Sequence, residues 1–284
     1  MGKTKILVCC HKPDQFISDD VYMPIQVGKA ISKYNLGIQG DDTGENISAE
    51  NPHFCELTGL YWAWKNMKPV DYIGLCHYRR YFNFHHRGSA FSNLSIVKSE
   101  NLCKLNLQIP DMDQLFESYD VILTKPKVYP YSLFIDYTSS HVRQDLVTIF
   151  SIVNELYPDY IKAMFNVFYE NNRLSHYNMM IMKWKDFDDY CNWLFSILFE
   201  AKKRINISYY SSFQGRIWGY LSERLLSVYV LQHRMKIKYY PVYWINDNVK
   251  QLGCFTRFQR TLRAQLAFEL LKSHRESEIQ IPSV

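Results

Sequence analysis

The stretch Asp71-Tyr-Ile-Gly-Leu-Cys-His-Tyr-Arg-Arg-Tyr-Phe82 decides how the rest of this sequence is interpreted. Its first half, residues 72–76, is apolar and predicts a short buried strand. Its second half places His77, Arg79 and Arg80 directly after that strand. Ligands of open α/β sheets bind at the carboxyl ends of strands, and guanidinium groups match phosphate oxygens with paired hydrogen bonds. The stretch therefore predicts a site for the diphosphate of a nucleotide-activated sugar.

The composition permits a full hydrophobic core and a small anionic ligand. The chain has 284 residues, of which 47% are hydrophobic, which is enough for one large domain or two small ones. The net charge of +5 is mild for this length. It is compatible with an anionic ligand or an anionic membrane surface, and it gives no reason to expect nucleic acid as a partner.

The cysteines and the N-terminus indicate a reducing compartment. The seven cysteines are scattered, their number is odd, and no two of them form a C-x-x-C pair. The apolar run after the first residues is too short for a signal peptide, and no stretch approaches the roughly 20 apolar residues of a membrane span. We therefore expect a cytoplasmic protein.

The N-terminal run Lys5-Ile-Leu-Val-Cys-Cys10 is typical of a central parallel strand. Cys10, His11 and Lys12 stand at its carboxyl end, where they are expected to face the nucleotide. A solvated turn around Pro13 is an equally good interpretation of the same residues.

Further elements follow from apolar periodicity and from turn residues. Residues 83–109 are polar and mixed, and they predict a long loop that acts as a lid over the site. The other predicted elements are helices over 55–66, 141–156, 159–169, 187–204 and 215–233, and strands over 119–124, 177–183 and 236–242.

The C-terminal tail predicts a basic amphipathic helix. Phe255, Phe258, Leu262, Leu266 and Leu270 recur at helical spacing, and Arg257, Arg260, Arg263 and Lys272 lie between them. Such a helix, over residues 255–272, can lie on an anionic membrane. It can also pack on the domain and leave a basic face in solvent. We divide the chain into a domain over 1–250 and a tail over 251–284.

Four stretches together carry a resemblance to a known family. They are Glu56-Leu-Thr-Gly-Leu-Tyr-Trp-Ala-Trp-Lys-Asn66, Gly74-Leu-Cys-His-Tyr-Arg-Arg-Tyr-Phe82, Tyr177-Asn-Met-Met-Ile-Met182 and Gly219-Tyr-Leu-Ser-Glu-Arg-Leu225. The sequence over about residues 4–245 resembles a bacterial family of glycosyltransferases with an uncharacterised domain, encoded in capsular, exopolysaccharide and O-antigen loci. Some members of that family are galactofuranosyltransferases.

The resemblance implies an α/β fold of the GT-A kind, with a Rossmann-type mixed sheet flanked by helices in a single domain. It implies transfer of a sugar, galactofuranose as the best guess, from a UDP-sugar to a hydroxyl of a polysaccharide repeat unit. The acceptor would be lipid-linked, at the cytoplasmic face of the membrane. A different class of function remains open, namely a non-catalytic protein that binds sugar nucleotides or polysaccharide in a capsule assembly complex.

The same resemblance leaves the use of a metal open. GT-A enzymes commonly carry a divalent metal, Mn²⁺ or Mg²⁺, on an Asp-x-Asp motif at a strand end, whereas the corresponding end here is His77-Tyr-Arg-Arg80. Cationic side chains can stabilise a departing diphosphate instead, because they also place positive charge where negative charge develops. Asp111 and Asp113 form an Asp-x-Asp before a predicted helix, and a helix cap is the preferred interpretation over a metal site.

The resemblance places a general base on the helix that begins near residue 215. Glu223 stands at the matching point, and a carboxylate there can accept the proton of an acceptor hydroxyl, giving inversion at the anomeric carbon. The alternative is a surface Glu223 paired with Arg224 or Arg216. Arg79, Arg80 and His77 would stabilise the leaving UDP.

Other candidates for substrate binding come from single positions. His141 could contact the acceptor, Asn178 could bond a sugar hydroxyl, and Arg216 could reach the diphosphate from the far side of the cleft. Tyr78 belongs to the same set because it lies within the first stretch. A helix cap for His141 and a turn for Asn178 are equally compatible with the sequence.

Overall fold

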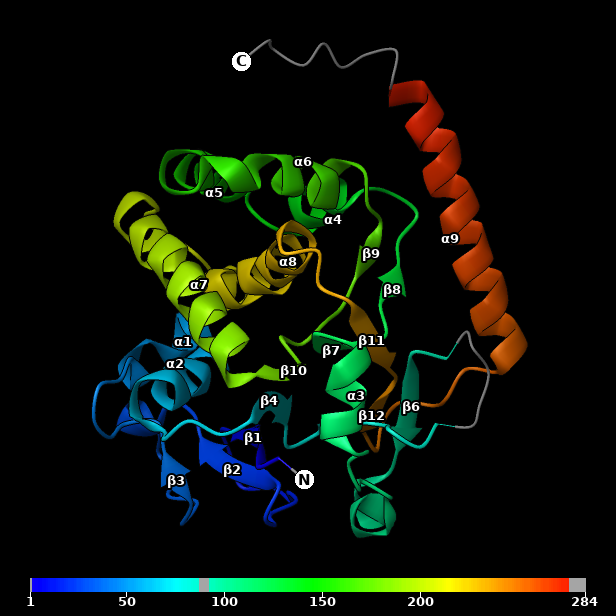
Figure 1. The fold of residues 1–284 in the computed structure, drawn as a ribbon. Helices are drawn as coiled ribbons and strands as arrows, with labels where there is room; N and C mark the ends of the chain where they lie inside the picture. Colours follow the sequence, from blue (N-terminus) through cyan, green and yellow to red (C-terminus); the bar gives the residue numbers. More distant parts are fainter. Residues whose placement is uncertain (1, 87–91, 276–284) are drawn as a thin grey trace.

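The computed structural model describes residues 2–86 and 92–275, and a mixed sheet lies at its centre (Figure 1). Its main path runs in the order β11 (Ile237–Tyr240), β7 (Val121–Thr124), β10 (Met180–Lys183), β4 (Tyr72–His77), β1 (Thr4–Cys10), β2 (Tyr22–Gln26) and β3 (Gln39–Gly40). Every strand of this path is parallel to β1 except β10, which is antiparallel to both of its neighbours. The α/β fold with a mixed, Rossmann-type sheet is confirmed.

Strand β1 shows why the sheet is buried on both faces. Alternate residues of a strand point to opposite faces, so an apolar run gives two apolar surfaces. Leu7 and Cys9 lie in one hydrophobic cluster. Ile6, Val8 and Cys10 lie in the other. The sheet is therefore the middle layer of the molecule.

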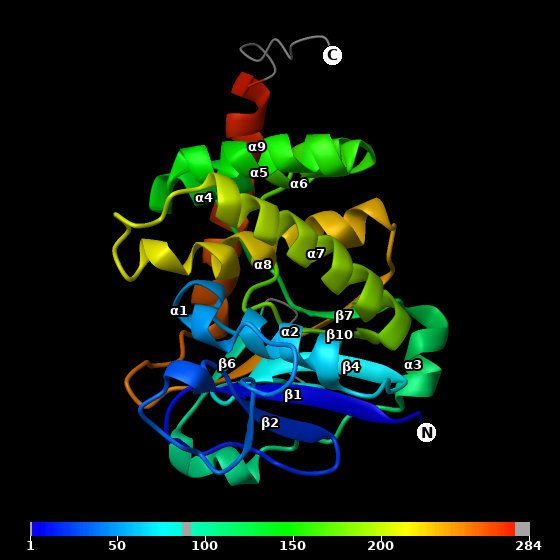
Figure 2. The same ribbon diagram turned by 90° about the vertical axis from the view of Figure 1, so that its left-hand side faces the viewer.

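Helices cover one face of the sheet, and shorter segments cover the other (Figure 2). The first group consists of α1 (Asn51–Phe54), α2 (Leu57–Asn66), α5 (Arg143–Leu156), α6 (Ile161–Tyr169), α7 (Trp184–Arg204) and α8 (Ile217–Gln232). The second group consists of the 3-10 helix η3 (Ser99–Lys104) and α3 (Met112–Ser118), which supply Leu102, Met112 and Phe116.

Strand β4 is pressed closely against β10. A Cβ atom on Gly74 would lie 2.6 Å from Cγ1 of Ile181 and 2.9 Å from the carbonyl oxygen of Met180. Only glycine fits this position without a shift of the neighbouring strand. The glycine in the middle of the opening stretch is thus required by packing.

The chain reverses after β4 and extends the sheet away from its main path. His77 pairs with Arg80, so β5 (Arg80–Phe82) runs antiparallel to β4. β12 (Val242–Ile245) pairs with β5 and also with β6 (Leu94–Val97). The prediction of a loop over 83–109 is therefore wrong for β6 and η3. β6 is only four residues long and pairs with β12, which is distant in sequence, so its residue pattern gives little indication of a strand. Residues 87–91 of the predicted loop lie outside the described part of the chain.

Two other predicted elements have different bounds. The strand expected over 177–183 begins only at Met180, because Tyr177 and Asn178 have φ angles of 78° and 52°. The helix expected from His141 begins at Arg143. His141 instead follows the last residue of the preceding helix α4 (Leu133–Ser140) and caps its C-terminal end. At the N-terminal end of α4, the side chain of Ser132 accepts a hydrogen bond from the amide of Ile135. Helix α4 is not predicted by the sequence pattern.

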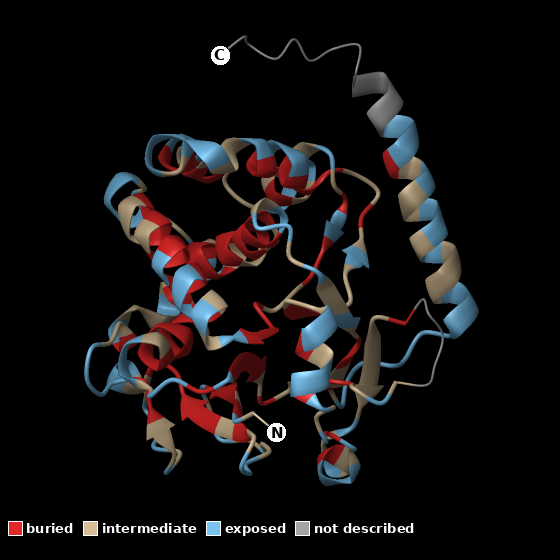
Figure 3. Cartoon of the chain, in the orientation of Figure 1, coloured by how far each residue is buried: buried red, intermediate tan, exposed pale blue. Residues whose placement is uncertain are grey.

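The tail helix α9 (Cys254–Arg275) extends along one side of the molecule (Figures 1 and 3). It contacts β8 (Lys127–Val128), which pairs with β9 (Arg173–Leu174), and it buries Phe268 to 4% exposure. An apolar stripe on its outer side stays exposed and consists of Phe255, Leu262, Leu266 and Leu270. Helix packing therefore does not cover these residues. The division of the chain at residue 250 stays a prediction.

Within the described residues, no helix combines the length and the apolar character that crossing a bilayer requires.

Candidate active site

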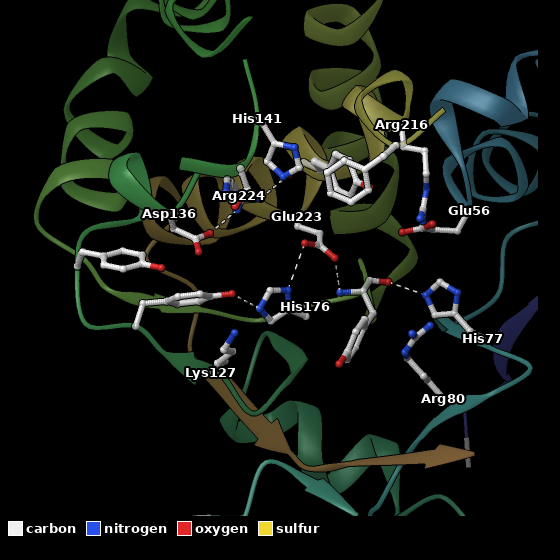
Figure 4. A pocket seen from close by; sticks show the side chains of 16 residues that line it. Glu56, His77, Arg80, Lys127, Asp136, His141, His176, Arg216, Glu223 and Arg224 are labelled. Atoms are coloured by element: carbon white, nitrogen blue, oxygen red, sulfur yellow. Dashed lines mark hydrogen bonds and ion pairs between the residues drawn. The ribbon is translucent and has the colours of Figure 1, made fainter. Parts of the chain in front are cut away.

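A cavity of about 510 Å³ opens at the carboxyl edge of the parallel strands (Figure 4). It lies between the end of β4, the segment before β10, helix α4 and the first turns of α8. Its charged and titratable lining residues include Glu56, His77, Arg80, Lys127, Asp136, His141, His176, Arg216, Glu223 and Arg224. The antiparallel β10 begins at this edge, so the residues before it meet the residues that follow β4 and β7.

Glu223 lies near the middle of the labelled side chains, with only 14% of its side chain exposed (Figure 4). Its Oε1 accepts a 2.7 Å hydrogen bond from the backbone amide of Tyr177, and its Oε2 lies 3.3 Å from Nδ1 of His176. Burial alone would raise the pKa of this carboxyl group. The hydrogen bond and charge of His176, the charge of Arg224 and the Tyr177 amide outweigh burial and hold the pKa below its ordinary value. Glu223 is therefore an ionised carboxylate at neutral pH.

A hydrogen-bonded chain extends from this carboxylate to a tyrosine. Nε2 of His176 lies 2.8 Å from the hydroxyl of Tyr129. Nδ1 of His176 donates a hydrogen bond toward Glu223, so the imidazole joins the Tyr129 hydroxyl to the carboxylate. The chain Tyr129–His176–Glu223 fixes the orientation of the carboxylate.

Tyr177 joins three groups of the site through its left-handed backbone conformation. Its amide bonds to Glu223, and its carbonyl oxygen accepts a 2.8 Å hydrogen bond from Nε2 of His77. Its ring lies 4.4 Å from the guanidinium carbon of Arg80. The buried Nε of Arg80 has no hydrogen-bond partner among the described residues. The guanidinium of Arg80 lines the cavity, so it can meet a ligand there.

His77 contributes to the site as a neutral donor. Burial lowers the pKa of its imidazole, and the nearby charge of Arg80 adds to this effect against the attraction of Glu56. The neutral ring donates from Nε2 to Tyr177, so it orients the segment that carries Tyr177. The lowered pKa favours the neutral ring at pH 7, and a role of His77 in stabilising the leaving UDP stays a prediction.

Glu56 and Arg216 form one side of the cavity (Figure 4). Arg216 donates from Nε to Sγ of Cys55 at 3.3 Å, and its guanidinium lies 5.5 Å from the ring centre of Tyr220. Glu56 accepts a 2.7 Å hydrogen bond from Asn178. A cation and an anion from separate elements are thus held in place side by side.

The opposite side carries a buried ion pair. Arg224 donates to Asp136 at 2.5 Å and to the carbonyl oxygen of Tyr220 at 2.9 Å. His141 stacks on Tyr220 with ring centres 4.3 Å apart, and its Nδ1 lies 3.3 Å from Gln214. Burial lowers the pKa of His141. Helix α4, which supplies Asp136, thereby closes the cavity.

Arg79 and Arg80, the two arginines of the opening stretch, have different surroundings at the turn between β4 and β5. Arg80 lines the cavity, whereas Arg79 does not. The guanidinium of Arg79 makes a 2.5 Å ion pair with Asp14 and is partly exposed. Arg79 lies in the turn itself, whereas Arg80 begins β5, so the two side chains leave the backbone in different directions. The prediction that Arg79 and Arg80 together stabilise the leaving UDP stays a prediction, and of the two only Arg80 lines this cavity.

The residues after β1 are also divided. Cys10 is fully buried, and its thiol bonds to the carbonyl oxygen of Val8, so its side chain does not face a nucleotide. Tyr78 is buried in the same cluster. His11 is exposed, and its ring packs edge-on against Tyr78 at 5.4 Å. Lys12 is partly exposed. Both faces of β1 are core, and only the residues beyond its end reach solvent.

Asn178 is a support for the cavity wall. It is 3% exposed and does not line the cavity. Its amide donates to Glu56, and its oxygen accepts a 2.9 Å hydrogen bond from Ser222. Its side-chain amide and oxygen are both engaged in the protein, and a direct contact of Asn178 with a sugar stays a prediction.

Asp111 and Asp113 lie at the opposite edge of the sheet. Asp111 caps α3 by accepting a 3.1 Å hydrogen bond from the amide of Gln114. Asp113 accepts from the amide of Gly2 and from the hydroxyl of Tyr72, at the start of β4. Within the described residues, no three His, Cys, Asp or Glu side chains are grouped so as to hold a metal ion. The helix cap is thus the observed role of Asp111.

Several lining residues were missed by the sequence analysis, namely Glu56, Lys127, Asp136, His176 and Arg224. Lys127 follows β7, so the rule that ligands meet strand ends could have found it. His176 could not be found in this way, because the sequence does not show that β10 is antiparallel. Asp136 was hidden because α4 was not predicted, and Arg224, on the predicted helix, was considered only as a partner of Glu223.

Comparison with known proteins gives one informative structure. A solved structure described as the apo form of the WbbM bifunctional glycosyltransferase is similar to this chain, with a TM-score of 0.77 and 30% sequence identity. The match covers 89% of this chain and 48% of the other, so this chain spans about half the length of that protein. No curated protein matches the chain.

A family match covers most of the sequence. Residues 5–234 match the family described as "Domain of unknown function (DUF4422)". Since this segment is well over half of the chain, the protein belongs to the DUF4422 family.

Proposed function

We propose that this protein is a glycosyltransferase whose active site is the cavity around Glu223. The observation that carries the proposal is the similarity in fold and sequence to a bifunctional glycosyltransferase over 89% of the chain. The cavity supports it, because an ionised carboxylate and cationic donors converge there from separate elements. Such a combination suits the two charges that move during sugar transfer.

In the proposed reaction, Glu223 accepts the proton of the acceptor hydroxyl. The acceptor oxygen forms a bond to the anomeric carbon as the bond from that carbon to the diphosphate oxygen breaks. The electron pair leaves with the diphosphate, and attack from the opposite side inverts the anomeric centre. Arg80 and Arg216 stabilise the departing negative charge, since both are cations that line the cavity. His77 and His176 are positioning residues.

The proposed donor is a UDP-sugar, and UDP-galactofuranose is the first candidate because the family that the sequence resembles includes galactofuranosyltransferases. The proposed acceptor is a hydroxyl of a lipid-linked polysaccharide repeat unit. We further propose that the apolar stripe of α9, which Arg260 and Arg263 accompany, contacts the anionic membrane surface that presents this acceptor.

A donor screen tests the enzymatic proposal. UDP release is measured with a panel of UDP-sugars and acceptors, with and without a chelator, so that any metal requirement is measured in the same assay. Glu223→Gln should lower kcat by about 10² to 10⁴-fold and leave UDP affinity within a few-fold of the parent value. Unchanged turnover would remove Glu223 from the mechanism. Retained UDP binding without turnover by the parent protein, across the whole panel, would favour a non-catalytic binding protein.

A further inference from the structure

A second cavity, of about 610 Å³, adjoins the candidate active site. Lys127, His176 and Tyr177 line both cavities. The second cavity lies between β6, the end of β7, β8 and the first turns of α9. A molecule bound in it would therefore lie next to His176, the partner of Glu223.

The charged side chains that line this second cavity are all cations. Its lining includes five lysine and arginine side chains, namely Lys125, Lys127, Arg173, Arg257 and Arg260, and no Asp or Glu occurs among the described residues that line it. The first cavity differs, because Glu56, Asp136 and Glu223 balance its cations. A concave surface with cations alone attracts anions and raises their local concentration. Phosphate oxygens form strong charge-assisted hydrogen bonds with such lysines and arginines.

One of these cations is held rigidly at the cavity wall. Arg257 donates from Nη1 to the hydroxyl of Ser92 at 2.6 Å and to the carbonyl oxygen of Leu94 at 2.9 Å. These bonds tie the start of α9 to β6, so the helix and its arginines are part of the cavity wall. Burial lowers the pKa of Lys125. A bound anion would act in the opposite direction and favour its charged form.

The second cavity also has an apolar part beside its polar and cationic residues. Leu94, Ile96 and Val242 come from β6 and β12, and Leu252 follows them toward α9. Leu252 is 41% exposed, and Phe255, the first residue of the apolar stripe of α9, is 70% exposed. Apolar side chains thus extend from the cationic group to the outside of the helix. A ligand that matches both parts carries an anionic head and an apolar chain.

We propose that the second cavity binds the phosphate-ester group of the acceptor, with its apolar chain directed along Leu252 toward α9. The role as acceptor site rests on the proposed glycosyltransferase function, whereas the binding of the phosphate ester does not. The sugar end of such an acceptor would reach Glu223 past the shared residues His176 and Tyr177.

Calorimetric titration of the 284-residue chain tests this site with soluble probes: decyl diphosphate below its micelle concentration, inorganic pyrophosphate, dihexanoyl phosphatidic acid and UDP. The variant Lys125→Gln/Arg260→Gln should lose at least about tenfold in affinity for decyl diphosphate and keep its affinity for UDP, because each lost contact is a charge-assisted hydrogen bond. Arg263→Gln, on α9 but outside the cavity lining, is the matched control and should bind like the parent protein. If the double variant does not fold, Arg260→Gln alone, at an exposed position, replaces it.

The outcomes separate this inference from the proposed function. Decyl diphosphate binding that saturating UDP does not abolish supports a second site, whether or not UDP release is ever detected. Abolition by UDP overturns it and leaves the glycosyltransferase proposal intact. If pyrophosphate binds as tightly as decyl diphosphate, the apolar part of the site is overturned. If dihexanoyl phosphatidic acid binds as tightly as decyl diphosphate, the site binds a phospholipid headgroup and the acceptor assignment is overturned. Unchanged affinity in the double variant also contradicts the inference.

Discussion

The backbone amide of Tyr177 donates a 2.7 Å hydrogen bond to Oε1 of Glu223, and Tyr177 holds this position with a φ angle of 78°. A left-handed conformation is uncommon and unfavourable for a residue with a side chain. It is maintained here by bonds on both sides of the peptide, because the carbonyl oxygen of Tyr177 also accepts from His77. One residue therefore links the end of β4 to the carboxylate on α8.

The pKa of Glu223 gives the first prediction. Its folded-state pKa lies below the ordinary value of 4.5, so it contributes stability above that pH, and this contribution is lost as the pH falls through the folded pKa. The acidic limb of a pH–rate profile should accordingly lie below 4.5. His176→Phe removes a hydrogen bond that lowers the pKa and should move the limb to higher pH.

Tyr129→Phe is the matched control for that experiment. It removes the bond to Nε2 of His176 and leaves the contact between Nδ1 and Glu223 in place, so its limb should move less. The measurement is kcat/KM between about pH 3 and pH 8 for the three proteins. A profile with the same limb in all three would show that His176 does not control the ionisation of this carboxylate.

The separation of Arg79 from Arg80 gives the second prediction. Arg80 lines the cavity, whereas Arg79 does not and is ion-paired with Asp14. Arg80→Gln should lower kcat/KM by about 10² to 10³-fold, as the loss of one transition-state donor does elsewhere. Arg79→Gln should change it only a few-fold. Steady-state UDP release measures both, and equal losses would contradict the assignment of the leaving group to Arg80.

The sequence predicted the sheet better than the site. The apolar run of β1 and the stretch from Asp71 to Phe82 placed two central strands correctly, because burial on both faces leaves an uninterrupted apolar pattern. The pattern did not show which of two adjacent arginines faces the cavity. That depends on a turn in which His77 pairs with Arg80, and turn geometry is not encoded in hydrophobicity.

The missing parts of the site share a physical cause. His176 and Tyr177 enter because β10 is antiparallel, and Asp136 enters because a polar-faced helix packs over the cavity. Both are consequences of long-range packing, which local periodicity does not record. Glu223 was identified only through the resemblance to a family, since a lone glutamate in a helix has no distinctive local signal.

The buried ion pair between Arg224 and Asp136 gives the third prediction. The two side chains are 5% and 12% exposed. Asp136→Asn leaves the arginine charge without its partner and should lower the free energy of unfolding by about 3–5 kcal/mol. Asp189→Asn breaks an exposed pair with Lys185 on α7 and should have little effect. Urea unfolding followed by tryptophan fluorescence measures both. Equal small losses would mean that the pair is hydrated in solution.

The apolar stripe of α9 gives the last prediction. Leu266 is 55% exposed on the outer side of the helix, and Arg263 lies one turn before it. Leu266→Asp removes apolar area that would enter the lipid and adds a charge that anionic headgroups repel, so binding to vesicles rich in phosphatidylglycerol should weaken about tenfold.

Val147→Asp is the matched control, because it introduces an aspartate at a position 42% exposed on α5, away from the stripe, and it should bind like the parent protein. Co-sedimentation at low and high salt measures the effect, with weaker binding expected at high salt. Equal weakening by both substitutions would attribute the loss to net charge and would exclude a specific role of the stripe.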